Sequence, residues 1–160
     1  MTELEVLFLF DEPLRKLEQD KLDYWVRGSP FKPGLWSLWC LSYGPIPANF
    51  MEAKAVVTVG AKASRFVMEN ATLPKRIKSA KLENRAFKVV EISGFGSFKY
   101  WLVLKSAGQN AMSARFAEQS GFRVSPAGDR KTIESLWTLK AAMTAKPVTV
   151  DHLEGNYGLG

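Results

Sequence analysis

An apolar run followed closely by an amphipathic one, between Phe98 and Phe122, constrains the fold of this chain more than any other segment. Residues 98–104 read Phe-Lys-Tyr-Trp-Leu-Val-Leu, the composition of a buried strand. After a short polar break, Met112, Phe116 and Ser120 fall at i, i+4 and i+8, which is one face of a helix. The next residue is a glycine, which favours the end of that helix. The segment therefore predicts a strand–helix–strand unit, with the second strand starting at Phe122.

Length and composition predict one folded domain. The chain has 160 residues, of which 46% are hydrophobic, so a single core can form. We expect the domain over residues 1–150 and a flexible tail over 151–160. The apolar runs are too short to cross a bilayer, and the acidic first residues are unlike a signal peptide, so we expect a cytoplasmic protein. The single cysteine, Cys40, excludes an internal disulfide, and we expect it to be buried.

The charge balance indicates an anionic partner. The chain has 22 Lys and Arg against 16 Asp and Glu, a formal net charge of +6. Nucleic acid or a phosphorylated cofactor would complement that excess. Part of it is concentrated in fourteen positions, at Lys75, Arg76, Lys78, Lys81, Arg85 and Lys88.

The apolar pattern predicts an alternating order of strands and helices. We expect strands over residues 4–10, 35–43, 53–59, 64–73 and 98–104, and a last strand from Phe122. Helices are expected from Asp11, a capping residue, to Gly28, over 74–92 and over 110–120. Residues 130–142 fit either a helix or, in part, a final strand. The predicted class is α/β (α+β), a single domain with helices flanking one sheet.

The segment after the fifth predicted strand also resembles a known motif. Asn110, Ser113, Gly121 and Phe122 stand at the offsets of the last core motif of the GNAT superfamily of N-acetyltransferases. Arg115, Ala117 and Glu118 fit a common variant of that motif. The resemblance implies a mixed, mostly antiparallel sheet. It also implies acyl transfer from acetyl-CoA, or another acyl-CoA, to an amine.

The resemblance places the cofactor's phosphates at the helix that follows the fourth predicted strand. In the family, glycines let the backbone of that turn approach the pyrophosphate. No glycine occurs here, so cationic side chains would have to replace those contacts. The matching positions are Lys75, Arg76, Lys78, Ser79, Ala80 and Lys81.

The resemblance also implies where the reacting groups lie. The pantetheine arm would pair with the fourth predicted strand, near the backbone of Asn70, Ala71, Thr72 and Leu73, and would touch Asn110 and Ser113. Glu69 on that strand would act as general base. Many family members have a tyrosine that acts as general acid at the position of Ala117. Because alanine cannot supply a proton, we assign the role of general acid to Tyr100.

Several points stay open at this stage. The amine acceptor is not named by the sequence, and nucleic acid is one candidate. The chain could be a monomer or a homodimer. A non-enzymatic, basic nucleic-acid-binding protein is the alternative function. The triplet Glu52-Ala-Lys54 resembles half of a metal-dependent nuclease site, but no second acidic residue accompanies it, so we predict no metal.

Overall fold

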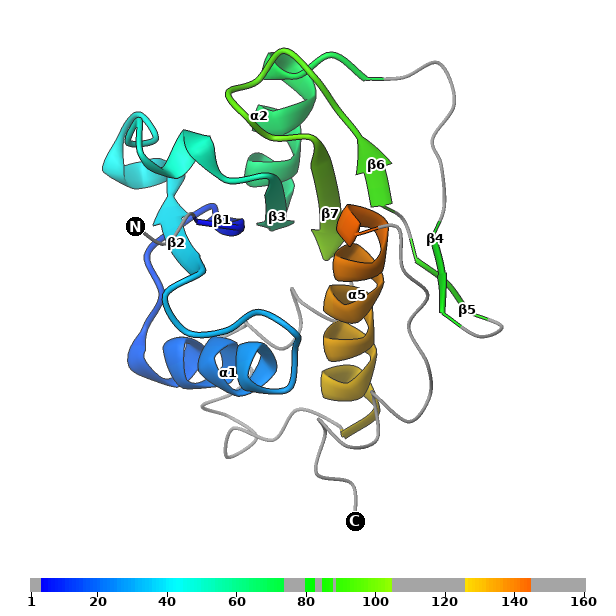
Figure 1. Cartoon of the computed structure of the whole chain (residues 1–160). Helices are drawn as coiled ribbons and strands as arrows, with labels where there is room; N and C mark the ends of the chain where they lie inside the picture. Colours follow the sequence, from blue (N-terminus) through cyan, green and yellow to red (C-terminus); the bar gives the residue numbers. More distant parts are fainter. Residues whose placement is uncertain (1–3, 74–79, 83–84, 88, 105–125, 145–160) are drawn as a thin grey trace.

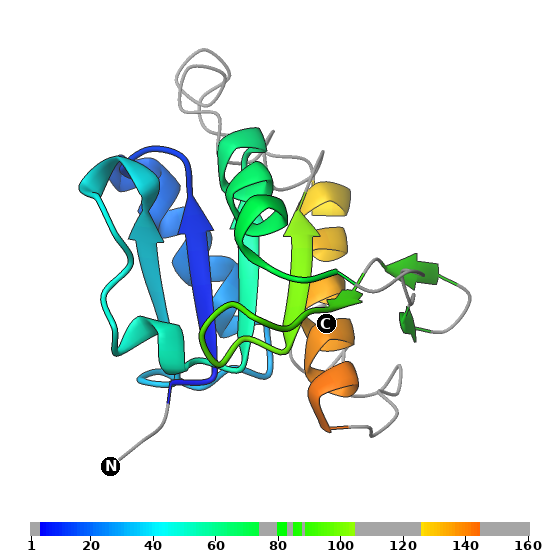
Figure 2. The same ribbon diagram turned by 90° about the horizontal axis from the view of Figure 1, so that it is seen from above.

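A five-stranded sheet with strand order β2-β1-β3-β7-β6 forms the centre of the protein (Figures 1 and 2). The computed structural model describes residues 4–73, 80–82, 85–87, 89–104 and 126–144. The strands of this sheet are β1 (Val6–Phe10), β2 (Trp36–Cys40), β3 (Ala55–Val59), β6 (Val89–Glu91) and β7 (Tyr100–Leu104).

The sheet is mixed, and most of its pairings are parallel. Strand β1 pairs in parallel with β2 and β3, β3 pairs in parallel with β7, and only β6 is antiparallel to its neighbour β7. The α/β class is therefore confirmed, but the predicted mostly antiparallel sheet is wrong. The physical reason lies in β1 and β3, which are apolar and buried along their whole length. Strands covered on both faces are typical of parallel sheets.

Helices cover both faces of the sheet, as Figure 2 shows. Helices α1 (Lys16–Arg27) and α5 (Pro126–Thr144) lie on one face, and α2 (Ala61–Asn70) lies on the other. The alternation along β1 separates the two cores. Val6, Phe8 and Phe10 point to the face with α1 and α5, while Leu7 and Leu9 point to α2.

Smaller elements complete the described structure. Two short 3₁₀ turns, η1 (Leu41–Tyr43) and η2 (Phe50–Glu52), lie between β2 and β3. Strands β4 (Ala80–Leu82) and β5 (Arg85–Phe87) form a separate antiparallel pair outside the main sheet, beside α5 (Figure 1). No described helix has the length and apolar character that crossing a membrane requires.

Two secondary-structure predictions are wrong. Residues 64–73 were expected as a strand, but most of them belong to helix α2. Its buried residues Ala63 and Val67 are four apart, a helical spacing. Residues 74–92 were expected as a helix, but the described parts of that range are strands β4, β5 and β6. Val89 and Val90 are buried opposite β7, where β-branched side chains pack well.

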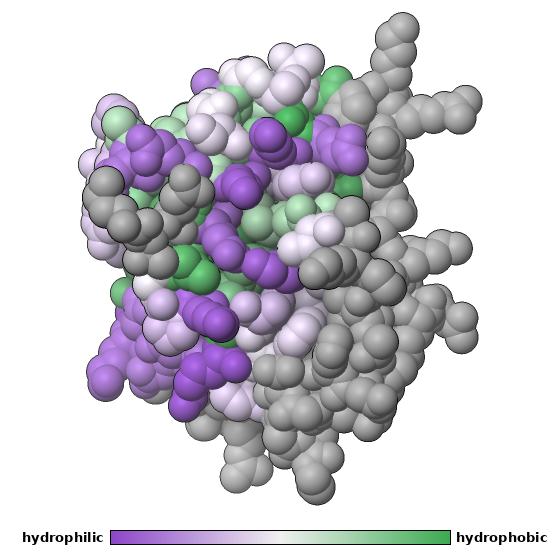
Figure 3. Space-filling model, in the orientation of Figure 1, coloured by the Kyte–Doolittle hydropathy of each residue, from purple (hydrophilic) through white to green (hydrophobic). Residues whose placement is uncertain are grey.

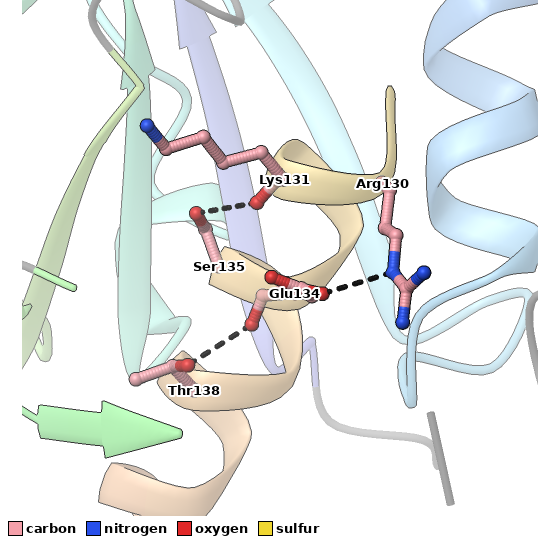
Figure 4. A network of polar contacts seen from close by, with 5 residues as sticks. All are labelled: Arg130, Lys131, Glu134, Ser135 and Thr138. Atoms are coloured by element: carbon pink, nitrogen blue, oxygen red, sulfur yellow. Dashed lines mark hydrogen bonds and ion pairs between the residues drawn. The ribbon is translucent and has the colours of Figure 1, made fainter. Parts of the chain in front are cut away.

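Helix α5 settles the alternative for residues 130–142, which are helical throughout. Unusually for a surface element, it buries polar side chains. Ser135 donates its hydroxyl to the carbonyl of Lys131 at 2.9 Å, and Glu134 accepts from Arg130 Nε at 3.2 Å (Figure 4). The motif at residues 110–122, the strand expected from Phe122 and the tail over 151–160 lie outside the described residues.

Candidate functional site

The topology places a crevice at the carboxyl ends of the parallel strands, along the edge of the sheet that these ends form. The parallel strands β1, β2, β3 and β7 all end at the same edge, where their arrowheads point in Figure 2. The chain leaves β1 into α1 on one face and leaves the adjacent β3 into α2 on the other. Ligands of open α/β sheets bind where two neighbouring strands diverge in this way.

A cavity of about 510 Å³ lies at this divergence. It is formed by the segments that follow β1 and β3, and its volume falls within the range of small-molecule sites. The polar and backbone groups that line it come from Asp11, Glu12, Arg15, Glu18, Gly60 and Ala61. We refer to this cavity as the carboxyl-edge crevice.

Asp11 joins the two strand ends. One carboxylate oxygen accepts the backbone N–H of Ala63 at 2.6 Å, and the other accepts that of Lys62 at 3.3 Å. Asp11 was expected to cap the helix that follows it in sequence, but it caps α2 instead. The first amides of α2 are therefore occupied by a carboxylate, which takes the place that a phosphate would use at a helix N-terminus.

The crevice is acidic although the chain is basic. Its lining has the carboxylates of Asp11, Glu12 and Glu18 against the single cation Arg15. Arg15 Nε lies 3.5 Å from Glu18, and Lys62 from α2 lies 3.7 Å from Glu12, whose side chain is 66% exposed. A concave, carboxylate-lined site concentrates cations and groups that donate hydrogen bonds.

Cys40 ends β2 at the same edge and is fully buried, as predicted. Burial raises the pKa of its thiol, and the nearby Glu12 carboxylate acts in the same direction. Hydrogen bonds with the Leu14 backbone and the Tyr43 side chain oppose this shift only in part. The thiol is therefore held neutral, which is unlike the environment of a nucleophilic cysteine.

We accordingly expect iodoacetamide to alkylate Cys40 at pH 8 at least about tenfold more slowly in the folded protein than in urea, because the thiolate is the reactive form. Mass spectrometry against time measures both rates, and a Cys40→Ser variant shows the background. The sign for stability follows from the raised pKa: the contribution of this thiol is complete below the ordinary cysteine pKa of about 8.5 and declines as pH rises above it. Equal rates in both states would contradict the buried, neutral thiol.

The residues predicted to be catalytic do not come together. Glu69 is exposed in the last turn of α2, on one face of the sheet. Tyr100 begins β7 and packs against the core on the opposite face, with α1 and α5. Both lie toward the edge opposite the carboxyl-edge crevice, because α2 runs away from that edge and β7 runs toward it. Glu52 is exposed in η2.

Half of the residues predicted to hold the cofactor lie within the described part of the chain. Asn70 ends α2, and the amides of Ala71 and Thr72 already donate to the carbonyls of Val67 and Ser93 at 2.8 and 2.7 Å. Leu73 is partly exposed beyond them. Ala80 and Lys81 belong to β4. Lys75, Arg76, Lys78, Ser79, Asn110 and Ser113 lie outside the described residues.

Sequence reasoning missed the crevice, although signals for it exist. Asp11 and Gly60 each follow directly after a five-residue apolar strand. Neither segment, however, contains a local pattern that predicts the parallel pairing of the two strands. Within the described part of the chain, no group of three or more His, Cys, Asp or Glu side chains is placed to hold a metal ion.

Comparison with known proteins assigns no family. No protein-family model, curated protein or solved structure matches the chain.

Proposed function

We propose that the carboxyl-edge crevice binds a small amine, and that the protein transfers an acyl group from acyl-CoA, such as acetyl-CoA, to that amine. The observation that carries the proposal is a cavity with three carboxylates at the divergence of β1 and β3, in a chain of net charge +6. A protonated amine is a cation with up to three donors, which complements those carboxylates.

The hydrogen bonds of Asp11 favour a cationic ligand over a phosphorylated one. The amides of Lys62 and Ala63 are directed at Asp11, so they are not available to an anion. A carboxylate offers about four lone-pair sites. Two of them are used by α2, which leaves acceptor capacity on Asp11 for an ammonium group.

The acyl-transfer step draws its support from the motif resemblance. The amine nitrogen would attack the thioester carbonyl, the carbon–sulfur bond would break, and the coenzyme A thiolate would leave and take up a proton. A carboxylate must accept the proton that the nitrogen loses. Glu12 suits that role because it is exposed and, within the described part of the chain, its ion pair with Lys62 is long, at 3.7 Å. The motif follows β7, whose carboxyl end lies at the same edge as the crevice.

Amine binding is tested by calorimetry with spermidine as the probe. The double variant Asp11→Asn/Glu12→Gln should bind it about tenfold more weakly, because two partly exposed charge contacts are lost. Asparagine caps helices about as well as aspartate, so α2 should persist. The matched control is Glu69→Gln, which removes an exposed carboxylate from the last turn of α2, outside the crevice. Equal weakening by the control would refute a local amine site.

Acyl transfer needs a separate test. Titration with acetyl-CoA should show saturable binding that weakens in Arg76→Ala/Lys78→Ala, and mass spectrometry should detect acetylated spermidine. Spermidine binding without any response to millimolar acetyl-CoA would leave an amine-binding protein and remove the transferase.

A second candidate function is non-enzymatic nucleic-acid binding, which the net charge of +6 favours. Such a protein binds with an affinity that falls steeply with salt. Titration of labelled single-stranded and duplex DNA at 50 and 200 mM salt measures this. Salt-dependent binding that is indifferent to acetyl-CoA and to the crevice variants would favour this second candidate.

A further inference from the structure

A second and larger cavity lies at the opposite edge of the sheet, away from the carboxyl-edge crevice. Its volume is about 800 Å³. It lies between α1 from Asp20 onward, the loop after α1 and the first residue of β2. Figure 3 views the molecule from this edge, with the hydrophilic surface of α1 at the lower left. We refer to it as the amino-edge cavity.

The walls of the amino-edge cavity are apolar and held in place. The apolar lining comes from Val26, Pro30, Phe31, Pro33 and Trp36. The Ser29 hydroxyl donates to the Val26 carbonyl at 2.6 Å and accepts the N–H of Phe31 at 3.2 Å. The Trp36 ring packs edge-on against Phe8, with ring centroids 5.8 Å apart. A site that is formed before binding loses little entropy when a ligand enters.

The loop is also tied to α5, on the same face of the sheet. Trp137 donates its indole N–H to the carbonyl of Gly28 at 2.7 Å. Lys140 lies 5.6 Å from the centre of the Phe31 ring and pairs with Glu5 at 2.8 Å. Two long-range contacts therefore position the apolar side of the cavity from outside it.

The charges at the cavity favour an anion. Arg27 and Lys32 line it and are exposed, and among the described residues no carboxylate lies within ion-pair distance of either. The two lining aspartates are already engaged. Asp20 lies 3.9 Å from Lys16, and Asp23 accepts a hydrogen bond from the Gln19 amide at 3.4 Å. Each aspartate thus has a partner on α1, whereas Arg27 and Lys32 have no carboxylate partner among the described residues and can face a ligand's carboxylate.

We propose that the amino-edge cavity binds a small amphipathic anion, with a flat apolar body and one carboxylate. The body lies against Trp36 and the two prolines, and the carboxylate faces Arg27 and Lys32. A guanidinium presents a planar fork that matches a carboxylate, while the lysine adds a point charge. This ligand is opposite in charge to the one proposed for the carboxyl-edge crevice, and the two cavities share no lining residue.

The test uses 2-naphthoate as the probe and its uncharged analogue 2-naphthamide as the ligand control. Calorimetry should show saturable binding of 2-naphthoate in the micromolar to low-millimolar range, and at least fivefold weaker binding of 2-naphthamide. Arg27→Gln/Lys32→Gln should weaken 2-naphthoate about tenfold, from two exposed charge contacts. Arg65→Gln removes an exposed cation from α2, outside the cavity and on the other face of the sheet, and should change nothing.

Amide chemical shifts decide where the probe binds and whether each variant is folded. Changes in amide chemical shift on addition of 2-naphthoate that are confined to residues 26–36 support the proposal. Shifts at residues 11–15 and 60–63 would move the probe to the carboxyl-edge crevice and overturn it. Equal affinities for 2-naphthoate and 2-naphthamide would also overturn it, as would an Arg65→Gln effect equal to that of the double variant.

Discussion

Replacing Gly60 with alanine is expected to destabilise the protein by about 3 kcal/mol or more. Gly60 stands between β3 and α2 with φ +115° and ψ 154°, a region that is essentially restricted to glycine. An added Cβ would also lie 2.5 Å from the Asp11 carboxylate carbon. The substitution therefore combines backbone strain with a steric overlap at the group that caps α2.

Gly44 supplies a matched control for the backbone part of that cost. Its φ of +108° and ψ of −158° fall in the same glycine-restricted region as those of Gly60, but a Cβ added there meets nothing within 4 Å. Gly44→Ala should therefore lose only the conformational term, about 1–3 kcal/mol. Urea denaturation of both variants gives the free energies of unfolding, and their difference isolates the overlap with Asp11.

A double-mutant cycle assigns that difference to its cause. Asp11→Ala removes the atoms that the new Cβ would meet, so Gly60→Ala should cost less in the Asp11→Ala background than in the wild type. The two losses should then sum to more than the loss in the double variant. Strict additivity, or equal losses for Gly60→Ala and Gly44→Ala, would contradict the close approach of Asp11 to this glycine.

The close approach at Gly60 also shows what the sequence could predict. The strands that contain Phe8 and Val57 were predicted because continuous apolar runs bounded by Asp and Gly permit little else. The position of the two strands next to each other in the sheet could not be predicted. Their parallel pairing depends on where α1 and α2 return the chain, which no local pattern encodes.

Helix α2 was wrongly predicted as a strand because its sequence is compatible with both a helical and an extended periodicity. From Ser64 onward the pattern mixes apolar and polar residues in a way that also fits an extended segment. The helix is decided by Ala63 and Val67, which need to reach the same core, and by Asp11, which caps the helix from 52 residues away. A cap supplied by another strand leaves no signal in the helix itself.

The opposite error, over residues 74–92, has the same origin. Val89 and Val90 read equally well as helix or strand, and pairing with β7 decides for the strand. The candidate site depended on both misread segments, because Glu69 lay in the first and the residues assigned to the cofactor phosphates lay in the second. Glu69 lies at the exposed end of α2. The acidic side chains of the crevice come from a segment that was expected to be helical from Asp11 onward.

Thr58→Val is expected to destabilise the protein by about 2 kcal/mol, although valine has the same shape and favours strands. The Thr58 hydroxyl accepts the indole N–H of Trp101 at 2.8 Å and lies 3.0 Å from the Ser64 hydroxyl. It thus links β3 to β7 and α2 in the core behind the crevice. Valine would leave the Trp101 N–H buried without its acceptor, and an unsatisfied buried donor costs more than a hydrogen bond contributes.

Thr138 is the matched control, because it is another buried threonine with a different role. Its hydroxyl donates at 3.0 Å to the carbonyl of Glu134, within helix α5 (Figure 4). That carbonyl can keep its helical backbone partner when the hydroxyl is lost, so Thr138→Val should change the free energy of unfolding by less than about 0.5 kcal/mol.

Adding Trp101→Phe distinguishes the hydrogen bond from packing. Phenylalanine removes the orphaned donor, so Thr58→Val should cost well under 1 kcal/mol in the Trp101→Phe background, against about 2 kcal/mol in the wild type. Urea denaturation of the four proteins in the cycle measures this coupling. An unchanged cost of Thr58→Val in both backgrounds would mean that the hydroxyl acts through Ser64 or through shape. The link between β3 and β7 would then not depend on the Trp101 donor.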